Sequence, residues 1–331
     1  MVVTIPLNAI RVDYPRWISP HGDLMVQQLG DFTQKFQLYQ SLNLSQDLIL
    51  PVHSQINDYM FPRASAERMY PTGLAMIYFT LMDYIYDNYQ GTNSAREIPS
   101  IYQNLVHNLI SLLKGQQVNS PNNFEQAVSS MLEEFSNVDP DWHAVFMQRL
   151  REYLDAVITS RSLALDAANL SLEIYWEVRS IDTGGVWSAS LIEYAHDCYL
   201  TPSQRSLEKV KLATSDMTRL CGTINDLFSY PREIANEEHP FNAVHILMMN
   251  EDQSLEEACY QLIEHFHMYL ERFMRTTDAI EAEGNLSLSS YVQGLREFVS
   301  GMWHWHQEAL RFRHPNSLFE EMRDQLHASS C

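Results

Sequence analysis

The chain has few glycines, few cysteines and few basic residues. Of its 331 residues, 11 are glycine and 4 are cysteine. Lysine and arginine together number 22, against 42 aspartates and glutamates. Scarce glycine, together with the lack of strand–turn–strand patterns, leaves little room for a β-sheet. The net charge of −20 argues against nucleic acid or an anionic membrane surface as a partner. The cysteines show no paired spacing, which fits reduced thiols, so we expect a cytoplasmic protein.

Two further kinds of pattern are missing. No apolar run is long enough to span a bilayer, and the N-terminus lacks a charged-then-apolar signal, so we expect a soluble protein without membrane insertion. No His-Glu-x-x-His or Cys-x-x-Cys string occurs, so a zinc site has no support. His304 and His306 do not change this, because residues two apart on a helix do not face each other.

Helical periodicity runs through almost the whole chain. Thr201-Pro202 is typical of a helix N-cap followed by proline, and Ser254 with Glu257 of a capping box. Apolar residues recur at helical spacing in 23–40, 64–90, 97–115, 122–136, 141–183, 186–200, 203–236, 239–250, 255–278 and 287–313. The sequence therefore predicts an all-α fold.

The domain organisation follows from composition. Hydrophobic residues make up 45% of the chain, enough for a large core, and no linker or composition shift divides it. We therefore expect a single domain over 1–331, with an N-terminal arm (1–20), a helical core (21–313) and a C-terminal tail (314–331).

Residues 225–233, with the sequence NDLFSYPRE, form the most informative segment. Asn225, Ser229 and Glu233 are spaced i, i+4, i+8, so they project from one face of a helix. Their amide, hydroxyl and carboxylate oxygens suit a Mg²⁺ ion that also binds a phosphate. Arg232, beside the last of them, could pair with that phosphate. An ordinary polar helix face is the alternative interpretation.

Pro231 conflicts with a regular helix at this position. Proline removes a backbone donor and crowds the preceding turn. We therefore expect the helix either to kink between Ser229 and Glu233 or to loosen there. A kink would change the angle between the ligands and make Mg²⁺ binding depend on substrate.

Two other segments carry suggestive patterns. Asp83 and Asp87 are one helical turn apart, so their carboxylates repel unless a cation or water lies between them; a solvated helix end is the alternative. Gly184-Gly185, in an apolar helical pattern after Arg179, predict an interrupted helix. Such a break leaves carbonyl oxygens unpaired, and these would stabilise a cation in a cavity. The alternative interpretation is an ordinary loop between two helices, with Arg179 in a surface ion pair.

These segments, together with residues 303–312, resemble the motifs of class I terpene synthases, which ionise prenyl diphosphates. The N-D-x-x-S-x-x-R-E string resembles the second metal motif of that family, and the Asp83 segment its aspartate-rich motif. Arg179 lies 46 residues before Asn225, where the family places its diphosphate-sensing arginine. The resemblance covers nearly the whole chain and implies an α-helical bundle around a central cavity.

The resemblance also implies the roles of individual residues. Three Mg²⁺ ions are expected, with Mn²⁺ as a substitute: Asp83 with Asp87 would hold two of them, and Asn225, Ser229 and Glu233 the third. The expected contacts to the diphosphate come from Arg179, Arg232 and Arg311. The positions that couple diphosphate sensing to the helix break are Asp182 and Thr183.

The aromatic positions show both agreement with the family and departures from it. Phe79 and Trp305 are expected to line the cavity and stabilise a carbocation, although plain core packing is the alternative for each. Tyr84 occupies the place of a second consecutive aspartate. Phe312 stands where the family has a tyrosine that donates to the diphosphate, and Arg313 could replace that contact.

The implied activity is that of a carbon–oxygen lyase of isoprenoid biosynthesis. A Mg²⁺-dependent terpene cyclase would ionise a prenyl diphosphate, cyclise the allylic cation to a terpene hydrocarbon or alcohol, and release diphosphate. Farnesyl diphosphate is the first expected substrate and geranylgeranyl diphosphate the second, giving a sesquiterpene or a diterpene. The resemblance also allows a homodimer, since helical dimers are common in the family.

Three alternatives to a cyclase stay open. Tyr84 and Phe312 favour a catalytically silent helical protein that binds a prenyl diphosphate. A chain-elongating prenyl transferase would carry two aspartate-rich motifs, and the Asn225, Ser229 and Glu233 set argues against it. A scaffolding helical protein would leave the ordered motifs unexplained.

Overall fold

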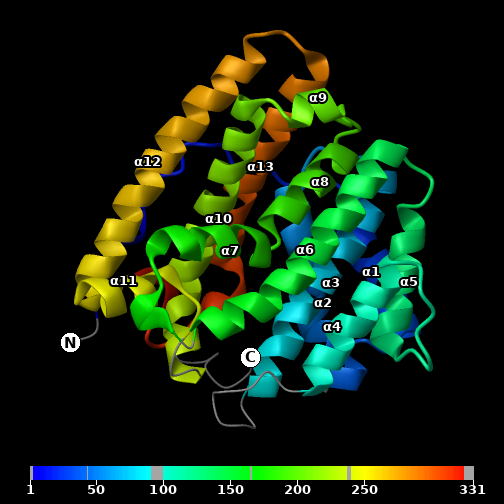
Figure 1. The fold of residues 1–331 in the computed structure, drawn as a ribbon, viewed down its shortest axis with the longest axis horizontal. Coiled ribbons are helices and arrows are strands. Elements are labelled where there is room, and N and C mark those ends of the chain that lie inside the picture. The colour runs from blue at the N-terminus through cyan, green and yellow to red at the C-terminus, as the bar shows by residue number, and fades with distance from the viewer. Residues whose placement is uncertain (1–2, 43, 91–99, 165, 237–239, 324–331) are drawn as a thin grey trace.

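The computed structural model describes residues 3–42, 44–90, 100–164, 166–236 and 240–323, and within them it does not describe the side chains of 47–48, 86–90, 100–102, 161 and 236 (Figure 1). These residues form helices and connecting segments. Among the described residues the one β-type pairing is an isolated parallel β-bridge between Ile5 and Phe319, near the two ends of the chain. The predicted all-α fold is confirmed.

The α-helices follow one another along the chain with short connections. Their bounds are α1 (Gly22–Lys35), α2 (Gln46–Met60), α3 (Ala66–Gln90), α4 (Ser100–Leu113), α5 (Asn123–Glu134), α6 (Pro140–Ala164), α7 (Leu172–Asp182), α8 (Gly185–Ala195), α9 (Pro202–Arg205), α10 (Glu208–Asn236), α11 (Ala243–Glu251), α12 (Leu255–Glu281) and α13 (Leu286–Glu308). Two short 3₁₀ segments matter below, η3 (Ala167–Asn169) and η4 (Leu310–Phe312).

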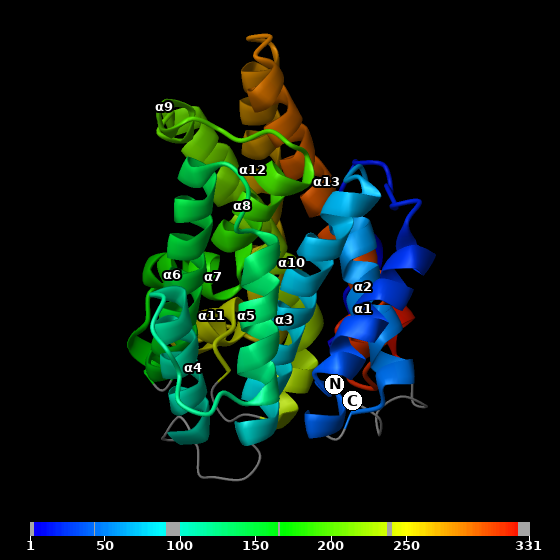
Figure 2. The ribbon, with the colours of Figure 1, turned by 90° about the vertical axis from the view of Figure 1, so that its right-hand side faces the viewer.

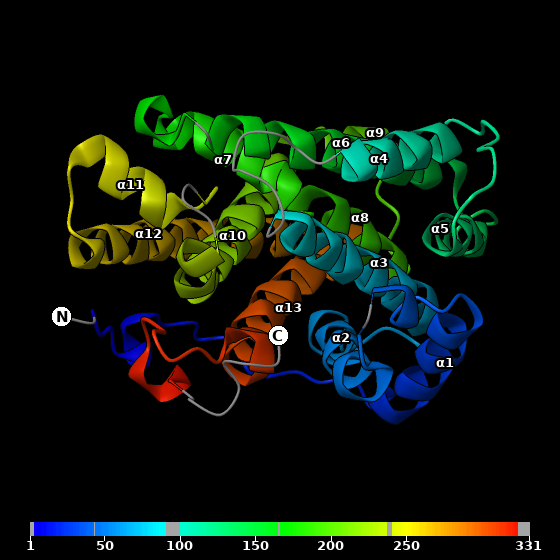
Figure 3. The ribbon, with the colours of Figure 1, turned by 90° about the horizontal axis from the view of Figure 1, so that it is seen from below.

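The helices pack as a bundle whose centre is formed by α3, α8, α10 and α13. Seen from below, α4, α6 and α7 lie along one side and α1 and α2 along the other (Figure 3). The long helix α10 packs against both α12 and α13, and α13 packs against α2. The side view shows α1 and α2 beside α13, with α4 and α6 on the far side of α3 (Figure 2). Helices that carry the sequence motifs thus converge from distant parts of the chain.

Aromatic side chains fill the core between α5, α6 and α8. Phe135, Trp142 and Phe146 contact one another with ring centroids 4.7–5.8 Å apart. The buried indole of Trp142 donates to the carbonyl of Ser190 at 2.8 Å, which satisfies its one polar group. This packing fixes α6 against α8, the helix that follows the predicted break.

Helix α2 was not expected from the sequence. The ranges of helical spacing found in the sequence do not include 46–60, because apolar periodicity identifies a helix only when its buried face is apolar. On α2 three buried positions are polar, namely Ser54, Asn57 and Asp58. The amide of Asn57 donates to the carbonyl of Met69 at 3.0 Å, so a contact with α3 satisfies it.

Several other helix boundaries also differ from expectation, and two of them bear on the site. The single helix predicted over 141–183 is two helices, because the chain turns through η3 and Ser171 caps α7 by accepting from the backbone of Ile174. The last core helix, predicted to reach residue 313, ends at Glu308, since Ala309 has an extended backbone. Arg311 therefore lies on η4 and not on α13.

The helix break at the paired glycines is confirmed. Gly184, between α7 and α8, has φ +69, a left-handed conformation that favours glycine. A Cβ atom added there would also lie 2.7 Å from the ring of Phe79, so the position needs glycine for space as well. By contrast, α10 continues through Pro231 to Asn236, so the expected loosening at this proline is not observed.

Candidate active site

Two adjoining pockets open between α2, α3, α6, α7, α8, α10 and the α13–η4 segment. Each encloses about 730 Å³ of space between atoms, open solvent included. Residues that line both pockets are Phe79, Asp83, Arg179, Asp182, Asn225 and Arg311. One pocket is largely charged, and the other is mostly apolar, with Ile56, Met60, Met76, Phe298, Met302 and Trp305 in its wall. The cavity thus has a charged end and an apolar end.

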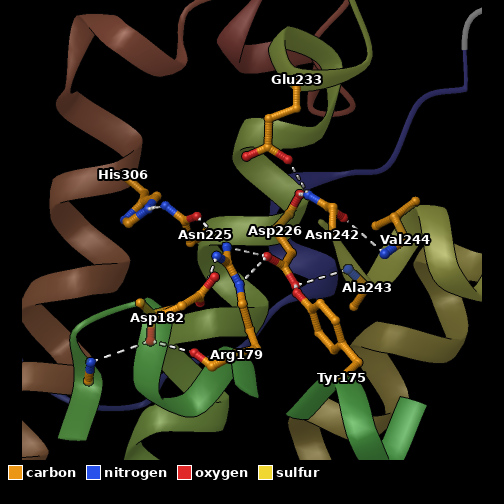
Figure 4. Close-up of polar contacts among 12 residues, drawn as sticks. Tyr175, Arg179, Asp182, Asn225, Asp226, Glu233, Asn242, Ala243, Val244 and His306 are labelled. Atoms are coloured by element: carbon orange, nitrogen blue, oxygen red, sulfur yellow. Dashed lines mark hydrogen bonds and ion pairs between the residues drawn. The ribbon is translucent and has the colours of Figure 1, made fainter. Parts of the chain in front are cut away.

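Arg179, on α7, is the centre of the charged end (Figure 4). Its Nη2 donates to Asp226 Oδ1 at 2.6 Å and to Asn225 Oδ1 at 2.9 Å. Its Nη1 donates to Asp182 Oδ1 at 3.3 Å. Burial lowers the pKa of the guanidinium, but Asp226 and its other acidic neighbours raise that pKa well above its ordinary value. The arginine is therefore a permanent cation, held between α7 and α10.

Asp226 is a functional candidate that the sequence reasoning missed. Its side chain is fully buried and accepts from the Tyr175 hydroxyl and, at 3.2 Å, from the backbone N–H of Ala243. Burial raises the pKa of this carboxyl although Arg179 acts in the opposite direction. Its position in the sequence could have identified Asp226, because it follows Asn225 directly in the motif. Its partners Tyr175 and Ala243 could not be identified from spacing.

Asp182 and Thr183 lie at the end of α7, beside the break. Burial raises the pKa of Asp182 to about 6, although Arg179 lowers it. The hydroxyl of Thr183 donates to the carbonyl of Arg179 at 2.9 Å, and Thr183 and Gly185 line the apolar pocket. Contacts along α7 thus connect Arg179 to the helix break at the cavity wall.

Two of the three predicted oxygen ligands on α10 reach the cavity, whereas Ser229 lines neither pocket. Asn225 and Glu233 line the charged pocket together with Arg232. Glu233 Oε2 accepts from the amide of Asn242 at 2.9 Å, a contact that the sequence did not suggest. Ser229 is buried, and its Oγ makes no hydrogen bond with the described residues. A buried hydroxyl without a partner costs about 1–3 kcal/mol, so this oxygen is suited to an additional ligand.

Asp83, on α3, faces these groups from across the cavity. Arg311 Nη2 donates to Asp83 Oδ2 at 2.6 Å, which links η4 to α3. Burial raises the pKa of this carboxyl, but the guanidinium groups of Arg311 and Arg232 outweigh burial and bring that pKa below its ordinary value. The side chain of Asp87, the other predicted acidic ligand, lies outside the described residues.

The aromatic residues divide between cavity and core. Phe79 lines both pockets, and Trp305 lines the apolar one. Phe312 is buried and packs edge-on to Trp305 with ring centroids 5.4 Å apart. Arg313 donates to the backbone carbonyls of Glu321 and Gln307, at 2.7 and 3.0 Å, and lines neither pocket. Its expected substitution for the family's tyrosine therefore has no support in this geometry.

Two features are absent from the described residues. No group of three or more histidine, cysteine, aspartate and glutamate side chains could hold a metal ion in that part of the chain. The predicted metal ligands differ from such a group, since two of them are an amide and a hydroxyl. In the same residues no helix has the length and apolar character needed to cross a membrane.

Comparison with known proteins identifies the family. Residues 75–272 match the family model described as terpene synthase family 2, C-terminal metal binding. A (12E)-labda-8(17),12,14-triene synthase from Streptomyces cyslabdanicus is 25% identical over 244 residues, which cover 72% of each chain. An aristolochene synthase from Aspergillus terreus is 26% identical over 155 residues, covering 44% of this chain and 48% of the relative.

Solved structures agree on the fold. A hedycaryol synthase in complex with HEPES superposes with a TM-score of 0.77 and 18% identity, over 90% of this chain and 97% of that one. A linalool/nerolidol synthase from Streptomyces clavuligerus gives a TM-score of 0.74 and 17% identity, over 90% and 99%. Because the family model spans more than half of the sequence, this chain belongs to terpene synthase family 2 and is a class I terpene synthase.

Proposed function

We propose that this protein is a Mg²⁺-dependent terpene cyclase that ionises a prenyl diphosphate, closes the allylic cation into a ring and releases diphosphate. Farnesyl diphosphate is the first proposed substrate and geranylgeranyl diphosphate the second. The observation that carries the proposal is the two-ended cavity, in which charged groups adjoin a mostly apolar pocket. A prenyl diphosphate has the same division into a charged head and an apolar chain.

The charged end supplies cations for the diphosphate head. Arg179, Arg232 and Arg311 all line it, in a protein whose net charge is −20. Attraction of a polyanion must therefore come from these local groups and not from the overall field. The planar guanidinium fork binds phosphate oxygens through paired hydrogen bonds, which lysine cannot do.

The oxygen ligands at this end fit a divalent cation. Asn225, Ser229 and Glu233 on α10 would hold one ion, and Asp83 with Asp87 on α3 the others. The orphaned Ser229 hydroxyl supports this, since it leaves an oxygen without a partner. The lowered pKa of Asp83 favours its ionised carboxylate, of which Oδ2 accepts from Arg311. Mg²⁺ bound there would neutralise the charge that develops on the departing diphosphate.

The apolar end would protect the cation from water. Phe79 and Trp305 line it, and a desolvated aromatic face stabilises a cation by roughly 0.5–2 kcal/mol. The break at Gly184 brings Thr183 and Gly185 into the same wall. Asp182 contacts Arg179 directly. Binding of diphosphate to Arg179 would therefore be transmitted through Asp182 to the helix break.

We further propose a single domain over residues 1–331 and a cytoplasmic location, and the resemblance to the family allows a homodimer. Membership of the family leaves the scaffolding alternative without support. The prenyl transferase alternative is disfavoured by the amide and hydroxyl ligands on α10, since a second aspartate-rich motif would be expected there. The silent binding protein is the alternative that the assay below addresses.

The first experiment is a product assay. Purified protein is incubated with Mg²⁺ and, separately, with geranyl, farnesyl and geranylgeranyl diphosphate, and the organic extract is analysed by gas chromatography–mass spectrometry. A cyclic hydrocarbon or alcohol from one substrate is expected, and its loss in Asn225→Ala would assign the activity to the α10 ligands. Diphosphate that stays unreleased with every substrate would overturn the cyclase and favour a silent binding protein.

A further inference from the structure

The side-chain amide of Asn225 is held at both ends. Its Oδ1 accepts from Arg179 Nη2 at 2.9 Å, and its Nδ2 lies 3.3 Å from His306 Nε2 (Figure 4). Arg179 comes from α7, Asn225 from α10 and His306 from α13, so three helices meet at this one amide. The orientation of the amide decides whether oxygen or nitrogen is offered to a metal ion.

The partners of His306 determine that orientation. Its Nδ1 lies 2.7 Å from the carbonyl oxygen of Met302, which can only accept, so Nδ1 carries the proton. With the proton on Nδ1, the other ring nitrogen, Nε2, carries a lone pair and accepts from its neighbour Asn225 Nδ2, which can only donate. Asn225 must therefore present its NH₂ group to His306. Arg179 has only donors, so it independently requires the oxygen on the other side.

Packing prevents the imidazole of His306 from turning. The ring is fully buried and stacks on Phe312, with centroids 4.2 Å apart and an angle of 21° between the planes. Phe228 and Trp305 pack edge-on against it at 5.5 and 5.0 Å. Phe312, the departure from the family pattern, thus contributes a ring face to His306.

His306 lines the apolar pocket, so a role as a base that removes a proton from the cation must be considered. Both of its nitrogens are already committed, Nδ1 to Met302 and Nε2 to Asn225. Neither is left to accept a proton from a molecule in the cavity. The arrangement suits holding another side chain in place.

We infer that His306 is a positioning residue, held by Phe312, that fixes the Asn225 amide so that its oxygen faces Arg179 and the charged end of the cavity. The inference rests on the proposed function, because it gives Asn225 Oδ1 the role of a metal ligand. Without the acceptor at Nε2, Arg179 alone would hold the amide, which then loses one of the two contacts that fix the direction of Oδ1 toward the cation site. Loss of a group that orients a metal ligand typically weakens metal binding by about 10- to 100-fold.

The test measures binding of inorganic pyrophosphate by isothermal titration calorimetry at a series of Mg²⁺ concentrations. His306→Phe keeps the ring and its stacking on Phe312 but removes both nitrogens. We expect it to raise the Mg²⁺ concentration for half-maximal binding by about 10-fold or more. His306→Gln places an amide oxygen near the former Nε2 and should restore most of the affinity, whereas the shorter His306→Asn should not.

His304→Phe is the matched control, because the same change is made two residues away on the same helix, at a side chain that lines neither pocket. It should keep the Mg²⁺ dependence of the wild type. Thermal unfolding in EDTA reports whether each variant is folded; if His306→Phe is not, the contrast between the Gln and Asn variants decides. Equal Mg²⁺ dependence in the wild type and in His306→Phe, or in the Gln and Asn variants, would overturn the inference.

The assay separates this inference from the proposed function. A wild type that binds no pyrophosphate at any Mg²⁺ concentration would overturn the metal-dependent function, and the positioning role with it. A wild type with Mg²⁺-dependent binding that His306→Phe leaves unchanged would overturn the positioning role alone.

Discussion

Arg179 donates two hydrogen bonds to Asp226, at 2.6 and 3.1 Å, across the contact between α7 and α10. The carboxylate has no exposed surface, and the arginine side chain is 12% exposed. A diphosphate that binds Arg179 must therefore share the guanidinium with the carboxylate of Asp226. This contact links α7 to α10 at the charged end of the cavity.

Asp226→Asn should destabilise the protein strongly. The substitution keeps the shape of the side chain but leaves Arg179 with a buried charge that is only partly compensated. Breaking a buried pair from one side typically costs about 3–5 kcal/mol in the free energy of unfolding, which urea denaturation measures. Asp278→Asn is the matched control, since Asp278 pairs with Arg296 at 2.6 Å but is 74% exposed. It should cost about 0–1 kcal/mol, and equal losses in the two variants would contradict this account.

Gly184→Ala should lower both stability and turnover. Alanine at φ +69 costs roughly 1–2 kcal/mol, and its Cβ must displace the Phe79 ring from the cavity wall. The control is Gly284→Ala, at φ +70, because nothing lies within 4 Å of the added atom and only the backbone penalty remains. Thermal unfolding and the rate of diphosphate release are measured on both. Full turnover in Gly184→Ala would show that the contact with Phe79 does not matter for catalysis.

Pro231→Ala should stabilise α10 and change the Mg²⁺ dependence of activity. Pro231 lies between Ser229 and Glu233 and has no backbone N–H, so the carbonyl of Leu227 lacks its helical hydrogen-bond donor. Alanine restores the donor and is favoured over proline by up to about 3 kcal/mol within a helix. We expect a higher melting temperature and a shifted Mg²⁺ concentration for half-maximal activity. Unchanged metal dependence would refute a role of this proline in ligand geometry.

Asp58→Asn should remove part of the pH dependence of stability. Burial, and then the charge of Asp23, raise the pKa of Asp58 from 3.8 to about 7. The folded protein therefore holds this proton more tightly than the unfolded chain, so the stability that Asp58 contributes is lost as pH rises from about 4 to about 7. Asparagine imitates the neutral acid at every pH. Urea denaturation at pH 5 and pH 8 should show a smaller difference for Asp58→Asn than for the wild type, and equal differences would contradict the prediction.

Features that depend on a few neighbouring residues could be predicted from the sequence. The N-cap at Thr201 and the capping box at Ser254 form as expected, because each needs only a side chain and a backbone group three residues away. The break at Gly184 is predictable for the same reason, since glycine tolerates the left-handed backbone wherever it stands. The motif on α10 is local as well, because helix geometry alone puts Asn225 and Glu233 on one face.

Features that depend on distant partners were decided by the tertiary structure. Asn225 and His306 are 81 residues apart, and Asp83 and Arg311 are 228 apart, so no local pattern announces either contact. Helix α2 escaped prediction because its buried polar groups become acceptable only where another helix supplies hydrogen bonds. Apolar periodicity reports which side of a helix is buried but not what lies against it. The sequence by itself thus determined most of the helices and the motifs, because these depend on neighbouring residues, whereas packing decided which polar groups meet in the cavity.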